Sequence, residues 1–200
     1  MTRIAAIIGT AGRKKDISKL TPQTYDRMKN ITRTILTREN IQHCVSGGAA
    51  WADHVLISLC LEGIIPPQNI TLHLPAELHN AQYASTGFKS AGGIANYYHR
   101  LMSNKIGHNT LAEIAEVIRL GARTDVSTEG FKARNTLVAN DATHSGGILI
   151  AMTFGVSKPW TAQKFVPDTS AHDAKLNPEG NGTIDTWNKA HCTKYHACLA

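Results

Sequence analysis

Three glycine-rich turns hold the residues of this chain that could do chemistry. They span residues 9–15, 46–53 and 180–183, and Arg134 with Asn135 stands between the last two. Glycines let backbone N–H groups approach a ligand closely, and helix N-termini and nearby cations favour negative charge. The first turn carries Arg13 and two lysines, and the second ends at Asp53. These residue types predict sites for phosphate groups, and a solvated surface loop is the alternative for the first turn.

The elements around the first two turns have the alternation of a parallel sheet. A continuous apolar run at 4–8, closed by Gly9, predicts a strand buried on both faces. Further apolar patterns predict a helix at 22–37, a strand at 41–45, a helix at 50–63 and a strand at 70–74. Strand, helix, strand, helix, strand is typical of right-handed βαβ units. We therefore expect the α/β class: an open, mostly parallel sheet with helices on both faces.

The second half of the chain adds an insertion and two more strands. Residues from about 75 to 127 are less regular, and we expect a helical insertion there that covers one end of the sheet, with helices at 94–102 and 111–120. After it we expect a helix at 132–142, a strand at 148–152, a long loop at 155–181, a helix at 183–191 and a strand at 194–198. The chain is predicted to be a single domain, 1–200.

The charge balance favours a local anion site over a broad nucleic-acid surface. Lys and Arg number 21 against 15 Asp and Glu, which gives a net charge of +6 and a pI near 9.2. The densest basic run is Arg13 to Lys15, too short for a tail that coats nucleic acid. No apolar stretch approaches the roughly 18 residues that cross a bilayer, and the first residues lead into a strand and not a signal peptide. We expect no membrane partner and a cytoplasmic location.

The turns, taken together, resemble the SLOG superfamily. The resemblance rests on 9–13, on 46–53, on Arg134-Asn135 with Val138-Ala139, and on 180–183, in this order, and is nearest to small proteins of the YspA type. The superfamily includes the DNA-processing protein A domain and the LOG phosphoribohydrolases. The resemblance implies a Rossmann-like fold and this ligand-binding set: Gly9, Thr10, Gly12, Arg13, Ser46, Gly47, Gly48, Trp51, Asp53, Arg134, Asn135, Gly180, Gly182 and Thr183.

Three positions depart from the family pattern. Trp51 stands where the family usually has glycine, so it either stacks on a base or plugs the core. Asn181 replaces a glycine of the last turn. Thr186 stands where the LOG enzymes have a glutamate, and Asp185 beside it is rotated by about 100 degrees on a helix. Phosphoribohydrolase chemistry therefore lacks its expected carboxylate.

We expect no cofactor and no metal site. The four cysteines are expected to be reduced thiols. Cys192 and Cys198, with His191 and His196, contain zinc-type ligands, but they lack paired C-x-x-C spacing and a plain terminal strand is favoured.

The leading hypothesis is a protein that binds a nucleotide or a nucleotide-derived signal, ADP-ribose-like or cyclic, as a sensor or a sponge. Such a homo-oligomer would act in a bacterial or phage-infected cytoplasm, where a sponge would oppose host defence. One alternative is an enzyme that hydrolyses a nucleotide N-glycosidic bond, with Asp53, Asp185 and Glu129 as candidate catalytic acids. Binding of single-stranded DNA is the other alternative, suggested by the positive charge.

Overall fold

Six parallel strands form the main sheet of the protein. The computed structural model describes residues 3–13, 16–126, 130–144, 146–154 and 181–199. The order across the sheet is β6-β3-β2-β1-β7-β8, and each neighbouring pair is parallel. The strands are β1 (Ile4–Gly9), β2 (His43–Ser46), β3 (Ile70–Leu74), β6 (Arg123–Val126), β7 (Ile148–Thr153) and β8 (Thr193–Cys198).

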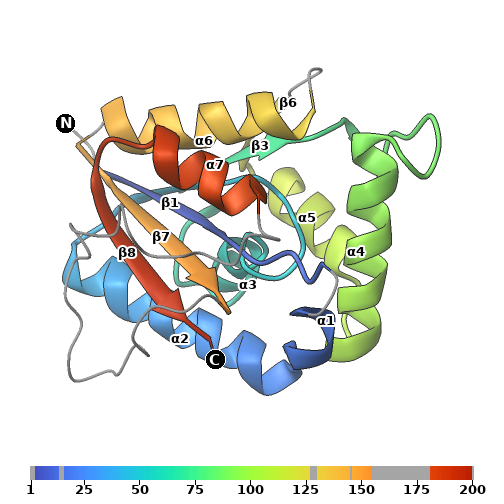
Figure 1. Cartoon of the computed structure of the whole chain (residues 1–200), viewed down its shortest axis with the longest axis horizontal. Coiled ribbons are helices and arrows are strands. Elements are labelled where there is room, and N and C mark those ends of the chain that lie inside the picture. The colour runs from blue at the N-terminus through green and yellow to red at the C-terminus, as the bar shows by residue number, and fades with distance from the viewer. Residues whose placement is uncertain (1–2, 14–15, 127–129, 145, 155–180, 200) are drawn as a thin grey trace.

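Helices cover both faces of this sheet, as Figure 1 shows. One face carries α6 (Phe131–His144) and α7 (Asn181–Lys189), and the other carries α2 (Pro22–Arg38), α3 (Val55–Leu61) and α5 (Thr110–Arg119). Along β1, Ala5 and Ile7 enter the core on the α2 side, while Ala6 and Ile8 enter the core under α6. A strand that is apolar at every position is therefore buried on both faces, as its composition predicts.

The helix α2 begins and packs as its sequence predicts. The Thr21 side chain caps it by accepting a hydrogen bond from the Thr24 N–H at 3.1 Å, and Pro22 occupies the first turn. The apolar residues Tyr25, Met28 and Ile31 fall on the buried face. Among the described residues, no helix is long and apolar enough to cross a membrane.

The strand order reverses at β1, which has β2 on one side and β7 on the other. From β1 the chain continues to β2 on one side, and β7 is followed by β8 on the other side. At such a reversal a crevice forms beyond the carboxyl ends of the two central strands. This is the geometry of a Rossmann-like α/β fold, and the predicted fold class is confirmed.

The segment expected to be an insertion contains a strand of the main sheet. It begins with a small hairpin, β4 (Leu78–His79) and β5 (Gln82–Tyr83), followed by α4 (Ala91–Ile106) and α5. It then forms β6, which pairs with β3 at the edge of the sheet. The two helices expected in the insertion are present, and the strands β4, β5 and β6 are additions that the sequence did not predict. Three of the four β6 residues are exposed, so the strand lacks the apolar pattern that reveals buried strands.

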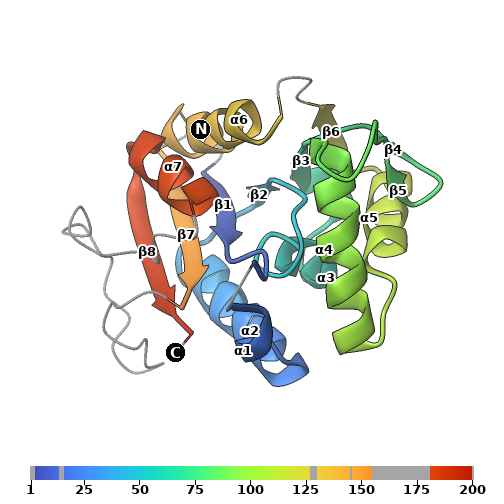
Figure 2. The same ribbon diagram turned by 45° about the vertical axis from the view of Figure 1, so that its right-hand side comes forward.

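Two short helices complete the described elements. They are α1 (Asp16–Lys19) and the 3-10 helix η1 (Pro67–Asn69). In Figure 2, α1 lies at the end of β1, and α4 stands across from α7.

Candidate functional site

A cavity of about 540 Å³ lies beyond the carboxyl ends of β1 and β7. Its walls come from the end of β1, the turn after β2, the end of β7 and the first turns of α6 and α7. The lining residues are Ile8, Gly9, Thr10, Ala11, Arg13, Asp16, Gly47, Ala49, Asp53, Phe131, Lys132, Arg134, Asn135, Val138, Thr153, Gly182, Thr183, Asp185 and Thr186.

The first turn supplies one cation to the cavity. Thr10 donates from Oγ1 to the Asp16 carboxylate at 2.8 Å, which ties the turn to α1. The Arg13 guanidinium lies 5.4 Å from the centre of the Phe131 ring and 5.5 Å from that of Tyr98. Rings at these distances attract a cation by their negative faces. Arg13 therefore bridges α6 and α4 across the cavity wall.

The second turn is closed by its own carboxylate. Asp53 Oδ2 accepts hydrogen bonds from the backbone N–H groups of Gly47 at 3.1 Å and Ala49 at 3.4 Å. Burial raises the pKa of Asp53, while Arg134 and these two N–H groups act in the opposite direction. The Asp53 carboxylate thus fixes the shape of the turn by binding two of the turn's backbone N–H groups.

Arg134 joins α6 to this second turn. Its Nη1 donates to the Gly47 carbonyl at 3.0 Å and its Nη2 to Oδ1 of Asn135 at 2.9 Å. Its Nε is buried and has no hydrogen-bond partner among the described residues. Burial lowers the pKa of Arg134, and the nearby Asp53 carboxylate opposes that shift. The pair places one buried positive and one buried negative group in the same wall.

The third turn is the beginning of α7. Thr183 donates from Oγ1 to the Gly9 carbonyl at 2.9 Å, which joins α7 to the end of β1. Asn135 donates from Nδ2 to the Asp185 carboxylate at 3.2 Å, and Lys189 pairs with the same carboxylate at 2.8 Å. Asp185 is therefore neutralised by partners on two helices before any ligand arrives.

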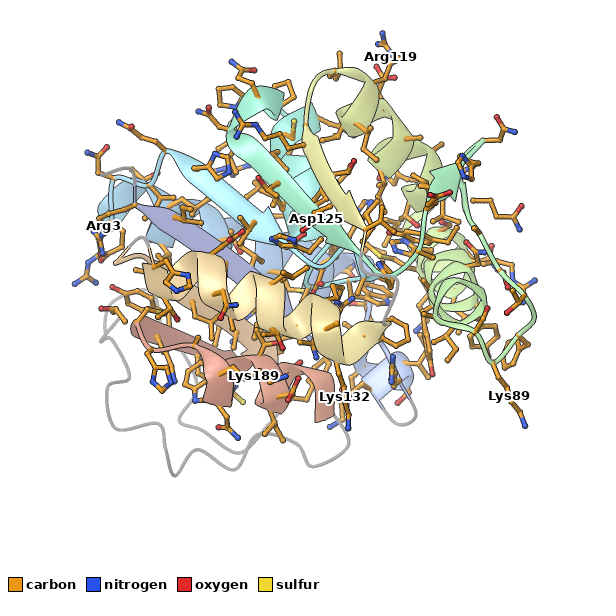
Figure 3. All side chains as sticks on the ribbon, turned by 90° about the horizontal axis from the view of Figure 1, so that it is seen from above. Arg3, Lys89, Arg119, Asp125, Lys132 and Lys189 are labelled. Atoms are coloured by element: carbon orange, nitrogen blue, oxygen red, sulfur yellow. The ribbon has the colours of Figure 1, made fainter. Side chains whose placement is uncertain are left out.

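Two helix N-termini add positive partial charges to the cavity. Three cations, Arg13, Lys132 and Arg134, and three acids line it, so the formal charges of its side chains balance. The N-termini of α6 and α7 both open on the cavity, and each carries a partial positive charge from its free N–H groups. Lys132 extends from the N-terminal end of α6 (Figure 3). The arrangement suits an anion.

Most of the predicted ligand residues are brought together here. The cavity contains Gly9, Thr10, Arg13, Gly47, Asp53, Arg134, Asn135, Gly182 and Thr183, and also the candidate acid Asp185. Gly180 and Glu129 lie outside the described residues. Four predicted ligand residues do not line the cavity, and these are corrections: Gly12, Ser46, Gly48 and Trp51.

Trp51 fills the core and offers no face to a ligand. Its side chain has no exposed area and packs edge-on against Tyr25, with ring centres 6.0 Å apart. Its φ is 66°, in the left-handed region that favours glycine. The interpretation in which a base stacks on Trp51 is therefore wrong, and the plugging interpretation fits its position.

The other three residues are turned away from the cavity. Gly12 lies against the Trp51 ring, where an added Cβ would come within 2.8 Å of Nε1. Ser46 is fully buried at the end of β2. The Gly48 carbonyl accepts hydrogen bonds from the Tyr83 hydroxyl at 2.7 Å and from His99 Nε2 at 3.1 Å. These residues therefore stabilise the turn on the side that faces away from the cavity.

Two buried histidines provide that support. His99 reaches Gly48 with one ring nitrogen and Thr110 Oγ1 with the other, at 3.0 Å. His54 contacts the Tyr25 hydroxyl at 2.8 Å and the Thr110 carbonyl at 3.1 Å. Burial lowers the pKa of His54 to about 3 and that of His99 to about 4, so both are neutral at pH 7. The second turn thus rests on a neutral hydrogen-bond network.

The predicted helix at 50–63 begins later than expected. Residues 50–54 form turns, and α3 starts at Val55 with no side-chain cap. A phosphate cannot therefore sit on its N-terminus at the second turn. The helix N-termini that reach the cavity are those of α6 and α7.

Several cavity residues were missed from the sequence. Phe131 precedes Arg134 by one helical turn, so its place beside a predicted cation was a usable signal. Ala49 lies within the predicted turn 46–53, whereas Asp16 and Thr153 had no such signal, because only the fold brings them to the cavity. Within the described residues, no group of three or more His, Cys, Asp or Glu side chains could hold a metal ion. Cys192 ends up packed beside the core under α7, and Cys198 is a buried residue of β8.

Comparison with known proteins gives one similar chain. It is "Uncharacterized protein R261" of Acanthamoeba polyphaga mimivirus, 34% identical over 191 residues that cover 92% of this chain and 88% of the relative. No protein-family model matches the chain, and no solved structure matches it. The similarity runs over most of both chains, so it concerns the whole domain and not one motif.

Proposed function

The chain belongs to the family of the mimivirus protein R261, and we propose that it binds a nucleotide or a nucleotide-derived signalling ligand in the cavity beyond β1 and β7. The ligand would be of the ADP-ribose or cyclic type, and the protein would act as its sensor or sponge. Phosphates would lie toward the N-termini of α6 and α7, near Arg13. The ribose and base would occupy the apolar wall at Ile8 and Val138.

The observation that carries the proposal is the pairing of a large cavity with two helix N-termini and Arg13. A volume of about 540 Å³ is within the range of small-molecule sites. Its position at the strand-order reversal is where open α/β sheets bind ligands. The Arg13 guanidinium contacts rings only, with no ion-pair partner among the described residues, so it is available to a phosphate.

The resemblance to the SLOG superfamily supports the same ligand class. It implies phosphate contacts for Gly9, Arg13 and Gly47, and these three residues share the cavity. The viral origin of the relative supports the sponge over the sensor. A viral sponge would work in the cytoplasm of an infected cell, and we expect it to be a homo-oligomer.

Hydrolysis of a nucleotide N-glycosidic bond is the second candidate, because Asp53 and Asp185 both line the cavity. Such a reaction needs a carboxylate near the anomeric carbon and a base that activates water. Asp53 is held by its own turn and Asp185 by Lys189, so neither is poised as a free base. Release of free base from nucleoside monophosphates, abolished by Asp53→Asn or Asp185→Asn, would establish the enzyme.

The binding proposal is tested with the purified chain. Denatured protein is searched by mass spectrometry for a released nucleotide, and calorimetry follows against mono-, di- and cyclic nucleotides. We expect Arg13→Gln to weaken binding at least tenfold, since it removes a charge-assisted phosphate contact. Arg119→Gln is the matched control, because Arg119 lies on α5 and pairs with Glu116. Absence of binding at high micromolar nucleotide would overturn the proposal.

A further inference from the structure

A row of rings and guanidinium groups leads from the cavity along α4. We call it the aromatic row; it consists of Arg134, Phe131, Arg13, Tyr98, Tyr97 and Phe88.

Each member of the aromatic row contacts the next. The Arg134 guanidinium lies 5.3 Å from the Phe131 ring centre, and Arg13 then bridges Phe131 and Tyr98. The ring centres of Tyr98 and Tyr97 are 5.2 Å apart, and those of Tyr97 and Phe88 are 5.3 Å apart. The row therefore extends over five successive contacts.

The outer end of the row is exposed. Phe88 is 66% exposed, and Tyr97 is only half-buried. Tyr98 packs against the hydrophobic core, which accounts for the position of this ring. Phe88 packs edge-to-face against Tyr97 and is otherwise exposed, so its ring is open to a stacking partner.

The loop that presents Phe88 is held in place by hydrogen bonds. Ser85 Oγ and Ser90 Oγ both donate to the Gly87 carbonyl, at 3.0 and 2.7 Å. Ser90 also caps α4 by accepting from the Gly93 N–H at 3.1 Å. The ring is thus displayed by an ordered turn, so little entropy is lost when a partner stacks on it.

Cations accompany the row on its whole length. The Arg100 guanidinium lies 5.7 Å from the Tyr97 ring centre, and Arg13 lies between Phe131 and Tyr98. Neither has an ion-pair partner among the described residues. Figure 3 adds Lys89, on the loop before α4. Rings with interleaved cations suit bases that are linked by phosphates.

We propose that the aromatic row is a second base-binding subsite, and that the ligand is a dinucleotide: two nucleobases joined through phosphate. One nucleotide occupies the cavity, the linking phosphate passes Arg13, and the second base stacks on the exposed Phe88 ring, which packs edge-to-face against Tyr97 at an interplanar angle of 77°. This inference rests on the proposed function and names its ligand class. The row continues the cavity wall through Arg13, which belongs to both.

Calorimetry on the full chain tests the subsite. The probes are 5′-phosphorylated dinucleotides of the four bases, the matching mononucleotides, and a single strand of eight nucleotides. We expect the best dinucleotide to bind about tenfold more tightly than its mononucleotide, because one stacked base contributes on that scale. Phe88→Ala and Tyr97→Ala should remove this gain and leave mononucleotide binding unchanged.

Two variants separate stacking from general surface effects. Phe88→Tyr keeps a ring and should keep the gain. Leu120→Ala removes an exposed apolar side chain, 45% exposed, from the end of α5 and should change nothing. Equal affinity for mono- and dinucleotides, or a gain that survives Phe88→Ala, would overturn the subsite. Affinity that keeps rising to eight nucleotides would overturn it in favour of a nucleic-acid strand. If mononucleotides also fail to bind, the proposed function fails with it.

Discussion

Arg134 donates from Nη1 to the carbonyl oxygen of Gly47 at 3.0 Å, and this bond joins two segments that are 87 residues apart in the chain. The same guanidinium faces Asp53, whose carboxylate accepts the Gly47 N–H. Both polar groups of the Gly47 backbone are therefore held by side chains of a buried charge pair. The shape of the second turn depends on that pair.

Arg134→Gln should destabilise the protein by about 3 kcal/mol, because it leaves the Asp53 carboxylate buried without its counter-charge. Arg134→Lys should lower the free energy of unfolding by less, since it keeps the positive charge and loses only the paired hydrogen bonds of the guanidinium. Urea unfolding measures both. Arg13→Gln is the control, because Arg13 is exposed and should affect ligand binding without affecting unfolding. An Arg134→Gln protein as stable as the wild type would contradict the role of the pair.

Gly47→Ala should cost about 2 kcal/mol. An added Cβ would lie 2.7 Å from Cζ of Arg134 and 2.8 Å from Oδ2 of Asp53, and both groups are pinned by hydrogen bonds. Gly182→Ala is the matched substitution, because its Cβ would meet only Asn135 Nδ2, at 3.6 Å. In the first turn of α7 it should leave stability unchanged or raise it by about 0.5 kcal/mol. Thermal melts should give a lower melting temperature for Gly47→Ala than for Gly182→Ala. Equal melting temperatures would show that the second turn can relax around the added Cβ.

The central strands and the edge strand β8 could be predicted from sequence, and the edge strand β6 could not. The strands β1 and β7 are apolar at almost every position, and the helix from Pro22 has a clear apolar face, so pattern and burial coincide. The strand β6 reads Arg-Thr-Asp-Val and is exposed on most positions, so only its pairing with β3 identifies it. β6 has little hydrophobic signal because three of its four side chains are exposed, whereas the other edge strand, β8, buries Tyr195 and Ala197 in the core.

The same limit applies to the candidate site. Glycine and arginine types in the turns predicted Gly9, Arg13, Gly47 and Arg134, and the fold brings these residues to one cavity. Residue type alone does not give the direction of a side chain, so it wrongly predicts Trp51 among the ligand contacts. A turn has no periodicity from which its inner and outer faces can be told apart.

Stability should fall as the pH drops from about 6.5 to about 4. His54 and His99 have folded-state pKa values of about 3 and about 4, below the value of 6.5 for an unfolded histidine. Between these limits the unfolded chain binds more protons, so unfolding is favoured as the pH falls, by about 1 kcal/mol per pH unit for each histidine. Above pH 6.5 both states are neutral at these sites and the effect vanishes.

The contribution of one histidine can be isolated by comparing variants. His99→Gln should reduce the slope of unfolding free energy against pH by about 1 kcal/mol per unit. Ser103→Ala removes a hydrogen bond to Thr110 from the same network without removing a titrating group, so its slope should match the wild type. Asp53 titrates in the opposite sense but is common to all three proteins. An unchanged slope in His99→Gln would show that His99 is not held neutral.

Substitution of Trp51 should affect folding and not ligand affinity. The ring is fully buried, so Trp51→Ala should cost about 3 to 5 kcal/mol from lost contacts and the cavity that remains. Trp51→Phe keeps part of the packing against Tyr25 and should cost less, leaving a folded protein for binding measurements. Calorimetry on Trp51→Phe should give wild-type nucleotide affinity, because the cavity lies on the other side of the second turn from this ring. If Trp51→Phe melts like the wild type and yet loses nucleotide binding, the ring contacts the ligand and the cavity assignment must change.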